Sequence, residues 1–174
     1  MSTFSTARLQ ARPVTVDDGP LFERLWGDER VGRTLGGVRD RAQVEQTLVE
    51  ASAHWRRWGF GRWSLHDGAH FVGTVKLAHC EIDGEPEIEL GYAVVPEFWG
   101  AGYATEASAG ALEHARDVLG LHEVVAFALV SNEASLAVMR RLGFRHERYL
   151  DRPAGPHELR RLVLASGSGS ALDR

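Results

Sequence analysis

The segment from Gly91 to Ala107 constrains the fold of this chain most, because it joins a strand, a glycine loop and a helix. It reads GYAVVPEFWGAGYATEA: a strand-like apolar run ends at Pro96, Gly100 and Gly102 follow, and a helical pattern then begins. Glycines let the backbone approach a ligand closely. The start of a helix offers unpaired N–H groups and the positive end of the helix dipole. We therefore predict a site for a phosphate or pyrophosphate group here.

Periodicity elsewhere predicts an α/β domain whose sheet is mixed but mainly antiparallel. Apolar runs typical of strands occupy residues 8–12, 62–66, 71–79, 87–95, 123–130, 144–150 and 157–164. Helical spacing is found in a segment that starts near residue 15 and in residues 40–58, 104–119 and 132–142. Asp67-Gly68 predicts a hairpin turn between two of these strands. We expect one domain over residues 1–165 and a flexible, Ser/Gly-rich tail over residues 166–174.

Charge and composition argue against several classes of protein. The formal net charge of −4 argues against general binding to nucleic acid, and Cys80 is the single cysteine, which excludes an intrachain disulfide. A half-buried strand position is the favoured interpretation of Cys80. The longest apolar run, Val124–Val130, is too short to span a bilayer, and the N-terminal residues lack the apolar core of a signal peptide. We expect a cytoplasmic protein that contacts neither nucleic acid nor a membrane.

The glycine loop does not match other phosphate-binding patterns. A nicotinamide site would place Gly-x-Gly-x-x-Gly after the first strand of a regular βαβ fold, and a P-loop would end in Gly-Lys-Ser/Thr. Neither pattern occurs here, which argues against a nucleotide-binding regulator. The histidines lack metal-ligand spacing, so we expect no metal ion.

Three motifs in order along the chain resemble the GNAT superfamily of N-acyltransferases, and in particular its RimJ/RimL-like branch. The run from Trp99 to Ala104 is similar to the acyl-CoA pyrophosphate motif, although Trp99 stands where Arg or Gln is commonest. Residues 6–13 resemble the opening strand of that branch. Residues 132–144 (NEASLAVMRRLGF) resemble its late Asn-x-x-Ser helix, which ends in Gly-Phe. The resemblance spans about residues 6–165.

The resemblance implies an enzyme that transfers an acetyl group from acetyl-CoA, its co-substrate, to a primary amine. The amine would attack directly in a ternary complex, without an acyl-enzyme, and would belong to a protein N-terminus or to a small molecule. In this family the strand that corresponds to residues 87–95 splays from its neighbour and pairs with pantetheine. The residues expected to bind acetyl-CoA are Ala93, Val94, Val95, Gly100, Ala101, Gly102, Tyr103, Ala104, Thr105 and Asn132.

Transfer to an amine requires a base, because an alkyl ammonium has a pKa near ~10 and little free amine exists at neutral pH. Glu89 is our candidate. It shares a strand face with Gly91 and Ala93, which leaves room for a thin ligand, and several GNAT enzymes carry a catalytic glutamate at this offset from the glycine loop. Burial in a cleft would raise its pKa into a useful range. Glu87 and Glu81 are weaker candidates, and a glutamate facing water on an edge strand is the structural alternative.

A proton donor near the departing CoA sulfur is the other catalytic need. Many GNAT enzymes use a tyrosine of the late helix, but Met139 occupies that position here. The resemblance implies Ser135 as the replacement, because RimJ/RimL-like enzymes often have a serine at this point; a serine that bonds to nearby backbone or to CoA is the alternative. Tyr103 and Tyr149 are further candidates, and Asn132 is expected to cap the helix, to contact CoA, or both.

The unfilled tyrosine position favours keeping a second hypothesis, a non-catalytic module that binds acyl-CoA as a sensor or as the partner of another protein. The resemblance places the second predicted helix and the turn after it over the acceptor, so Trp58 and Phe60 are expected to wall that pocket. Both a monomer and a homodimer are compatible with these patterns, and none of them identifies the amine.

Overall fold

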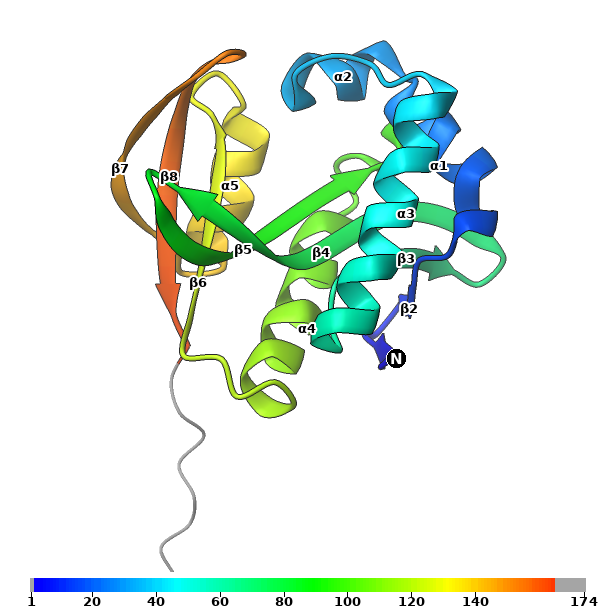
Figure 1. Ribbon diagram of the computed structural model, residues 1–174, viewed down its shortest axis with the longest axis horizontal. Helices are drawn as coiled ribbons and strands as arrows, with labels where there is room; N and C mark the ends of the chain where they lie inside the picture. The colour runs from blue at the N-terminus through cyan, green and yellow to red at the C-terminus, as the bar shows by residue number, and fades with distance from the viewer. Residues whose placement is uncertain (1, 165–174) are drawn as a thin grey trace, which may run out of the picture.

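The computed structural model describes residues 2–164 and contains an eight-stranded sheet. Its strands are β1 (Phe4–Ser5), β2 (Gln10–Pro13), β3 (Arg62–Asp67), β4 (His70–Ile82), β5 (Glu85–Val94), β6 (Glu123–Leu129), β7 (Arg145–Arg152) and β8 (Gly155–Val163). Their order across the sheet is β1-β2-β3-β4-β5-β6-β8-β7, and each neighbouring pair is antiparallel except β5–β6. The expected mixed, mainly antiparallel α/β fold is confirmed (Figure 1).

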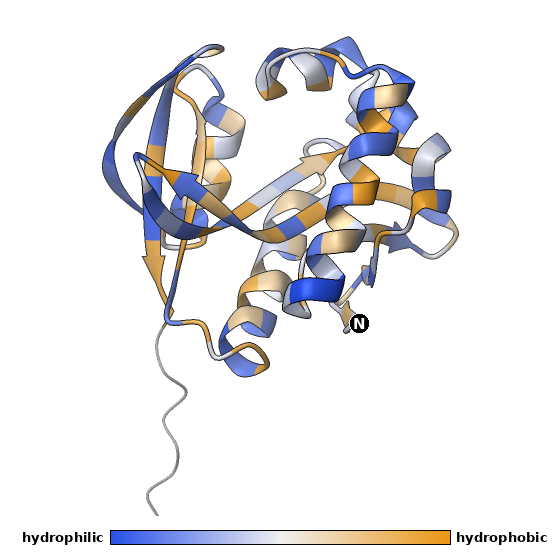
Figure 2. Cartoon of the chain, in the orientation of Figure 1, coloured by the Kyte–Doolittle hydropathy of each residue, from blue (hydrophilic) through white to orange (hydrophobic). Residues whose placement is uncertain are grey.

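The helices cover both faces of this sheet. They are α1 (Gly19–Trp26), α2 (Glu29–Leu35), α3 (Arg41–Trp58), α4 (Tyr103–Asp117) and α5 (Glu133–Arg141), with short 3-10 turns η1 (Val16–Asp18) and η2 (Pro96–Phe98). Phe71 of β4 packs on Phe22 of α1 with ring centroids 5.5 Å apart, whereas the adjacent Val72 joins the core that contains Ala107 of α4. Successive residues of a strand point to opposite faces, so β4 separates two cores. Figure 2 shows apolar residues along β4 and β6, whereas β7 is mostly hydrophilic.

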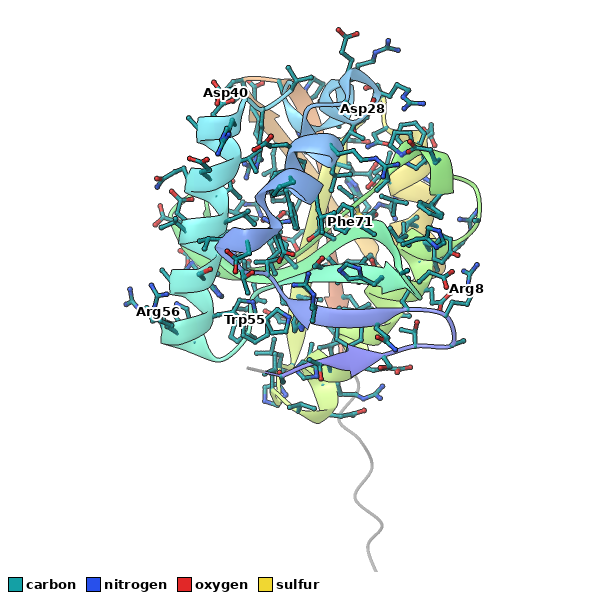
Figure 3. All side chains as sticks on the ribbon, turned by 90° about the vertical axis from the view of Figure 1, so that its right-hand side faces the viewer. Arg8, Asp28, Asp40, Trp55, Arg56 and Phe71 are labelled. Carbon is teal, nitrogen blue, oxygen red and sulfur yellow. The ribbon has the colours of Figure 1, made fainter. Side chains whose placement is uncertain are left out.

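Helix α3 begins and ends where local chemistry predicts, which confirms the expected helix over residues 40–58. Asp40 and Gln43 form a reciprocal capping box at its start, and Gly59 ends it in the left-handed conformation, with φ of 74°. Its buried face, which includes Val44 and Leu48, packs in the same core as α1. Figure 3 shows this helix from the side, with Asp40 and Arg56 labelled near its two ends.

Two elements were not predicted from the sequence. Helix α2 has only seven residues, too few for a clear periodic pattern, and the side chain of Asp28 caps it. Strand β1 has two residues. The β3–β4 hairpin was expected to turn at Asp67-Gly68, but Asp67 pairs with His70, so Gly68 and Ala69 form the turn. The predicted tail over residues 166–174 lies outside the described residues.

Strands β5 and β6 diverge, and their divergence positions the site. They are parallel neighbours with one paired position, Glu89 with Val125. Strand β5 pairs with β4 over its whole length, from Glu85 to Val94, and β6 pairs with β8 in the same way. Both strands continue beyond the Glu89 pair, so a gap opens between them. Residues from the start of α4 and from α5 line this gap.

Candidate active site

A cleft of about 1100 Å³ lies where β5 and β6 diverge. This volume lies near the upper end of the usual range for ligand pockets. The walls come from α1, α2, β5, the glycine loop, α5 and the β7–β8 turn. Most of the predicted site residues meet in this cleft: it is lined by Glu89, Ala93, Val94, Gly100, Gly102, Tyr103, Ala104, Thr105, Asn132 and Ser135. Val95 and Ala101 do not line it.

The glycine loop forms a cradle of backbone N–H groups. Gly100 and Gly102 adopt φ of 77° and 83°, a left-handed conformation that favours glycine. The first helical hydrogen bond of α4 runs from Glu106 N–H to Gly102 O at 3.0 Å, so the N–H groups of Tyr103, Ala104 and Thr105 have no helical acceptor. Gly102 supplies no side-chain cap, and a methyl group at Gly100 would meet no atom within 4 Å. The donors and the open space suit a pyrophosphate group.

Arg8 binds both the glycine loop and the first turn of α4, a role that the sequence patterns did not reveal. Its guanidinium donates to Glu106 Oε2 at 2.7 Å and to Ala101 O at 3.0 Å, and it lies 4.1 Å from the ring centroid of Tyr103. Burial by itself raises the pKa of Glu106, but hydrogen bonds from Thr6 and Arg8 outweigh it and the net pKa is lowered. The carboxylate therefore stays charged and ties the first helical turn to the N-terminal segment.

The edge of β5 that faces the gap carries backbone groups for a thin ligand. Val95 N–H donates to Val72 O on β4 at 2.8 Å. Backbone groups alternate in direction along a strand, so those of Tyr92 and Val94 face the opposite side, toward the gap. The indole of Trp99 already donates to Val94 O at 2.7 Å, which fixes the end of the strand. The N–H groups of Tyr92 and Val94 and the carbonyl of Tyr92 therefore face the gap.

Glu89 lies at the centre of the cleft in an ion pair. Its Oε2 accepts from Lys76 Nζ at 2.7 Å, and its Oε1 lies 3.2 Å from the position that a Cβ on Gly91 would take. Lys76 is the only lysine of the chain, and its pairing with Glu89 was not anticipated. The other carboxylates considered lie elsewhere: Glu87 is bound by Arg161, Glu81 is exposed, and neither lines the cleft.

Cys80, on β4, is the half-buried strand cysteine that was expected. Burial, followed by the nearby charge of Glu89, raises its pKa to about 11, which makes its thiol a poor nucleophile at neutral pH.

Ser135 and Tyr92 form a hydroxyl pair on the opposite wall from Glu89. Tyr92 Oη lies 2.9 Å from Ser135 Oγ and donates to Ser135 O at 3.0 Å. Burial raises the pKa of Tyr92 to about 12, so it keeps its proton at neutral pH. Asn132 Oδ1 accepts from Ser135 N–H at 3.1 Å, which confirms the expected helix cap. Tyr92 was not among the candidates drawn from the sequence; its one signal was a hydroxyl on an otherwise apolar strand face.

The other tyrosine candidates make different contacts. The hydroxyl of Tyr103 donates to Asp67, and its ring is buried, so it braces the glycine loop. Tyr149 is 63% exposed on β7 and does not line the cleft. Met139, which occupies the family's usual tyrosine position, is buried in the core.

The end of the cleft beside Trp26 and α2, called the acceptor end below, has other walls than those expected around the acceptor. Trp58 and Phe60 pack on His79 and do not line it. Its walls are instead Trp26, helix α2 and the β7–β8 turn, because α2 approaches that turn: a Cβ on Gly36 would lie 3.9 Å from Ala154 Cβ. The unpredicted helix α2 is the reason for the error. Within residues 2–164 no three His, Cys, Asp or Glu side chains gather as a metal site.

Comparison with known proteins decides the family. A profile of the acetyltransferase (GNAT) domain matches residues 8–145. This chain belongs to the GNAT acetyltransferases. The FsC-acetyl coenzyme A-N(2)-transacetylase of Aspergillus fumigatus is 37% identical over 155 residues, which are 83% of this chain and 65% of that relative's length.

Solved structures agree with this assignment. An acetyltransferase from Agrobacterium tumefaciens is 25% identical, with a TM-score of 0.82 over 93% of this chain and 94% of that one. Mycobacterium smegmatis RimJ, solved with a CoA-disulfide, is 22% identical and shares the fold, with a TM-score of 0.79 over 93% of this chain and 87% of that one. The resemblance stated from the motifs is confirmed.

As a member of this family, the protein is an acetyl-CoA-dependent N-acetyltransferase. The glycine cradle of this chain suits a pyrophosphate group such as that of acetyl-CoA. In the part of the chain that the structure describes, no helix has the length and apolarity needed to cross a membrane.

Proposed function

We propose that this enzyme acetylates a primary amine, on a protein N-terminus or a small molecule, by direct attack on acetyl-CoA within the cleft. One observation carries the proposal: the glycine cradle, the Glu89 carboxylate and the Ser135 hydroxyl all line the same cleft, at the point where β5 and β6 separate. An arrangement of this kind holds both reactants together and converts a bimolecular reaction into one within a complex.

In this proposal acetyl-CoA binds along the gap. Its pyrophosphate accepts hydrogen bonds from the backbone of Gly100–Thr105, and its pantetheine pairs with Tyr92 and Val94. Asn132 holds the start of α5, and hence Ser135, beside the thioester. Support for this placement comes from the N–H groups that lack helical partners and from the open space over Gly100.

Glu89 serves as the base. Lys76 occupies one of its carboxylate oxygens and fixes the side chain over Gly91, which leaves Oε1 for the incoming ammonium group. The amine gives its proton to Glu89, directly or through a water, and its nitrogen forms the new bond to the carbonyl carbon. The carbon–sulfur bond then breaks, the electron pair stays on sulfur, and the nitrogen releases its second proton to water as the amide forms.

Ser135 stabilises the departing thiolate by donating a hydrogen bond to the sulfur. For Ser135 to donate to sulfur, Tyr92 donates its single proton to Ser135 Oγ, 2.9 Å away, in place of Ser135 O, and its raised pKa keeps it a donor across the neutral range. The pair therefore stabilises the charge that develops on sulfur without giving up its own protons.

The test combines acetyl-CoA binding by calorimetry with CoA thiol release across a panel of peptides and small amines. We expect release with at least one class of amine. Glu89→Gln should lower turnover about 10²- to 10⁴-fold, the range for loss of a general base, while acetyl-CoA affinity stays unchanged. Glu81→Gln is the matched control, because Glu81 is exposed outside the cleft. Tight acetyl-CoA binding without turnover on any amine would favour the non-catalytic sensor instead.

A further inference from the structure

The acceptor end of the cleft carries two half-buried arginines side by side. Arg39 and Arg62 lie on the ring of Trp26, with their Cζ atoms 4.6 Å and 5.1 Å from its centroid, and all three residues line the cleft. Arg39 belongs to the segment between α2 and α3, and its N–H donates to Trp26 O at 2.9 Å. Arg62 begins β3. We call Arg39 and Arg62 the arginine pair.

Within residues 2–164 the arginine pair has no carboxylate partner. The guanidinium of Arg62 donates to Thr74 Oγ1 at 3.4 Å, and that of Arg39 donates to Thr47 Oγ1 at 3.2 Å. Most of the other half-buried arginines of the described chain form ion pairs. Arg12, for example, binds Asp18. Burial, followed by the charge of Arg39, lowers the pKa of Arg62 to about 10. The charge of Glu50 favours the charged form of Arg39, and that of Glu89 the charged form of Arg62, but neither carboxylate forms an ion pair with them. Two adjacent guanidinium groups without an ion-pair partner would be stabilised by a bound anion.

The cleft offers no internal charge that would neutralise the pair. Glu89 is the nearby carboxylate, but Lys76 already pairs with it at 2.7 Å. Two more arginines, Arg33 and Arg152, line the cleft, and within the described residues neither makes an ion pair; the Cζ atom of Arg152 lies 4.2 Å from the ring centroid of Phe127. The acceptor end therefore has a net positive charge.

Strand register places the arginine pair close to the reacting centre. Arg62 pairs with Lys76, and Lys76 pairs with Gly91, so these three residues form one row across β3, β4 and β5. Neighbouring strands are about 4.8 Å apart, and Glu89 lies next to Gly91 on the same face. A group bound at Arg62 is therefore only a few bonds from an amine bound at Glu89.

We propose that the acceptor carries an anionic oxygen group, a carboxylate or a phosphate, which the arginine pair binds while the amine faces Glu89. This inference rests on the proposed acetyl transfer and narrows the acceptor to acidic amines. The arginine fork binds such groups through two parallel hydrogen bonds. Binding the anion also fixes the distance of the amine from the thioester.

The test compares matched amines. Linear amino carboxylates and amino phosphonates of increasing length are paired with the uncharged amine of the same length, and peptides with aspartate at the second position are paired with their asparagine forms. The readout is the ratio of kcat/KM for the acid to kcat/KM for its neutral partner. We expect a ratio of about 10 to 100 for one length in the small-molecule or the peptide series. This is the change in rate constant that corresponds to the free energy of a hydrogen bond to a charged group.

Arg62→Gln and Arg39→Gln should each lower that ratio toward one, whereas Arg62→Lys should retain part of it. Arg56→Gln is the control, since Arg56 is exposed on α3 away from the cleft (Figure 3). Inorganic phosphate should compete with the amine in the wild-type enzyme and compete less well in Arg62→Gln. The inference is overturned if neutral amines are acetylated as well as acidic ones, or if the preference survives in both glutamine variants. Absence of transfer to every amine would instead refute the proposed function, and this inference with it.

Discussion

Gly91→Ala tests the role of Glu89 by moving its carboxylate without removing it. A Cβ at this position would lie 2.6 Å from Lys76 Cε and 3.2 Å from Glu89 Oε1. Ordinary contacts begin at about 3.4 Å, so the Lys76–Glu89 pair must shift by roughly 1 Å, a displacement that can cost about 10²-fold in rate. Gly91 has no left-handed backbone and Lys76 is flexible, so the strand should accept the methyl group. We expect kcat to fall about 10²-fold while the Kd for acetyl-CoA, measured by calorimetry, stays unchanged.

Gly19→Ala is the matched control, because a methyl group at Gly19 would meet no atom within 4 Å and this residue lies at the start of α1, away from the cleft. It should leave both constants unchanged. Wild-type kcat in Gly91→Ala would refute the reasoning, since the carboxylate would then have no required position. An equal loss of acetyl-CoA affinity would show that Gly91 serves the co-substrate and not the base.

Three further predictions follow from other contacts. Arg8→Ala should raise the KM for acetyl-CoA about three- to fivefold in steady-state kinetics, because the exposed hydrogen bond from the Arg8 guanidinium to Ala101 O is lost. An unchanged KM would show that the loop does not need this hydrogen bond. Tyr92→Phe and Ser135→Ala should each lower kcat about 10-fold with little change in KM, and the double variant should lose less than the product of the two, because the hydroxyls act as one pair; a fully multiplicative loss would contradict this. Burial raises the pKa of Asp18, but hydrogen bonds from Arg12 and Thr15 outweigh burial, and the net pKa is lowered. The stabilisation that this carboxylate contributes to the fold is therefore present above the ordinary Asp pKa of about 3.9 and is lost as the pH falls through the lowered value. Thermal melts should therefore show a weaker pH dependence below about pH 4 for Asp18→Asn than for the wild type; parallel curves would refute it.

Local patterns predicted the parts of the fold that depend on neighbouring residues. The glycine loop between a strand and a helix, the extent of α3 and the order of most strands and helices could be predicted from short segments, because turn chemistry and hydrophobic periodicity act over a few residues. Helix α2 escaped prediction because its seven residues carry too few apolar positions. That omission led to the wrong residues for the acceptor wall, Trp58 and Phe60.

The parts of the site that escaped prediction are contacts across the sheet or between distant segments. Lys76 reaches Glu89 only because β4 and β5 pair in one particular register. Tyr92 meets Ser135 because α5 packs beside the gap, 43 residues along the chain. Such pairs depend on tertiary structure, for which a single sequence carries no local signal, so the place of Glu89 beside the ligand gap could be predicted while its partner Lys76 could not.

Direct transfer between two substrates held in one cleft is the central claim, and a single-turnover experiment tests it most directly. The enzyme is loaded with acetyl-CoA, mixed with an amine that it accepts, quenched at short times, and analysed by intact-protein mass spectrometry together with product and free thiol. We predict that acetylated amine and free CoA appear together in equal amounts while the mass of the protein never changes. Acetylated protein that forms before the product and decays as the product appears would contradict direct attack.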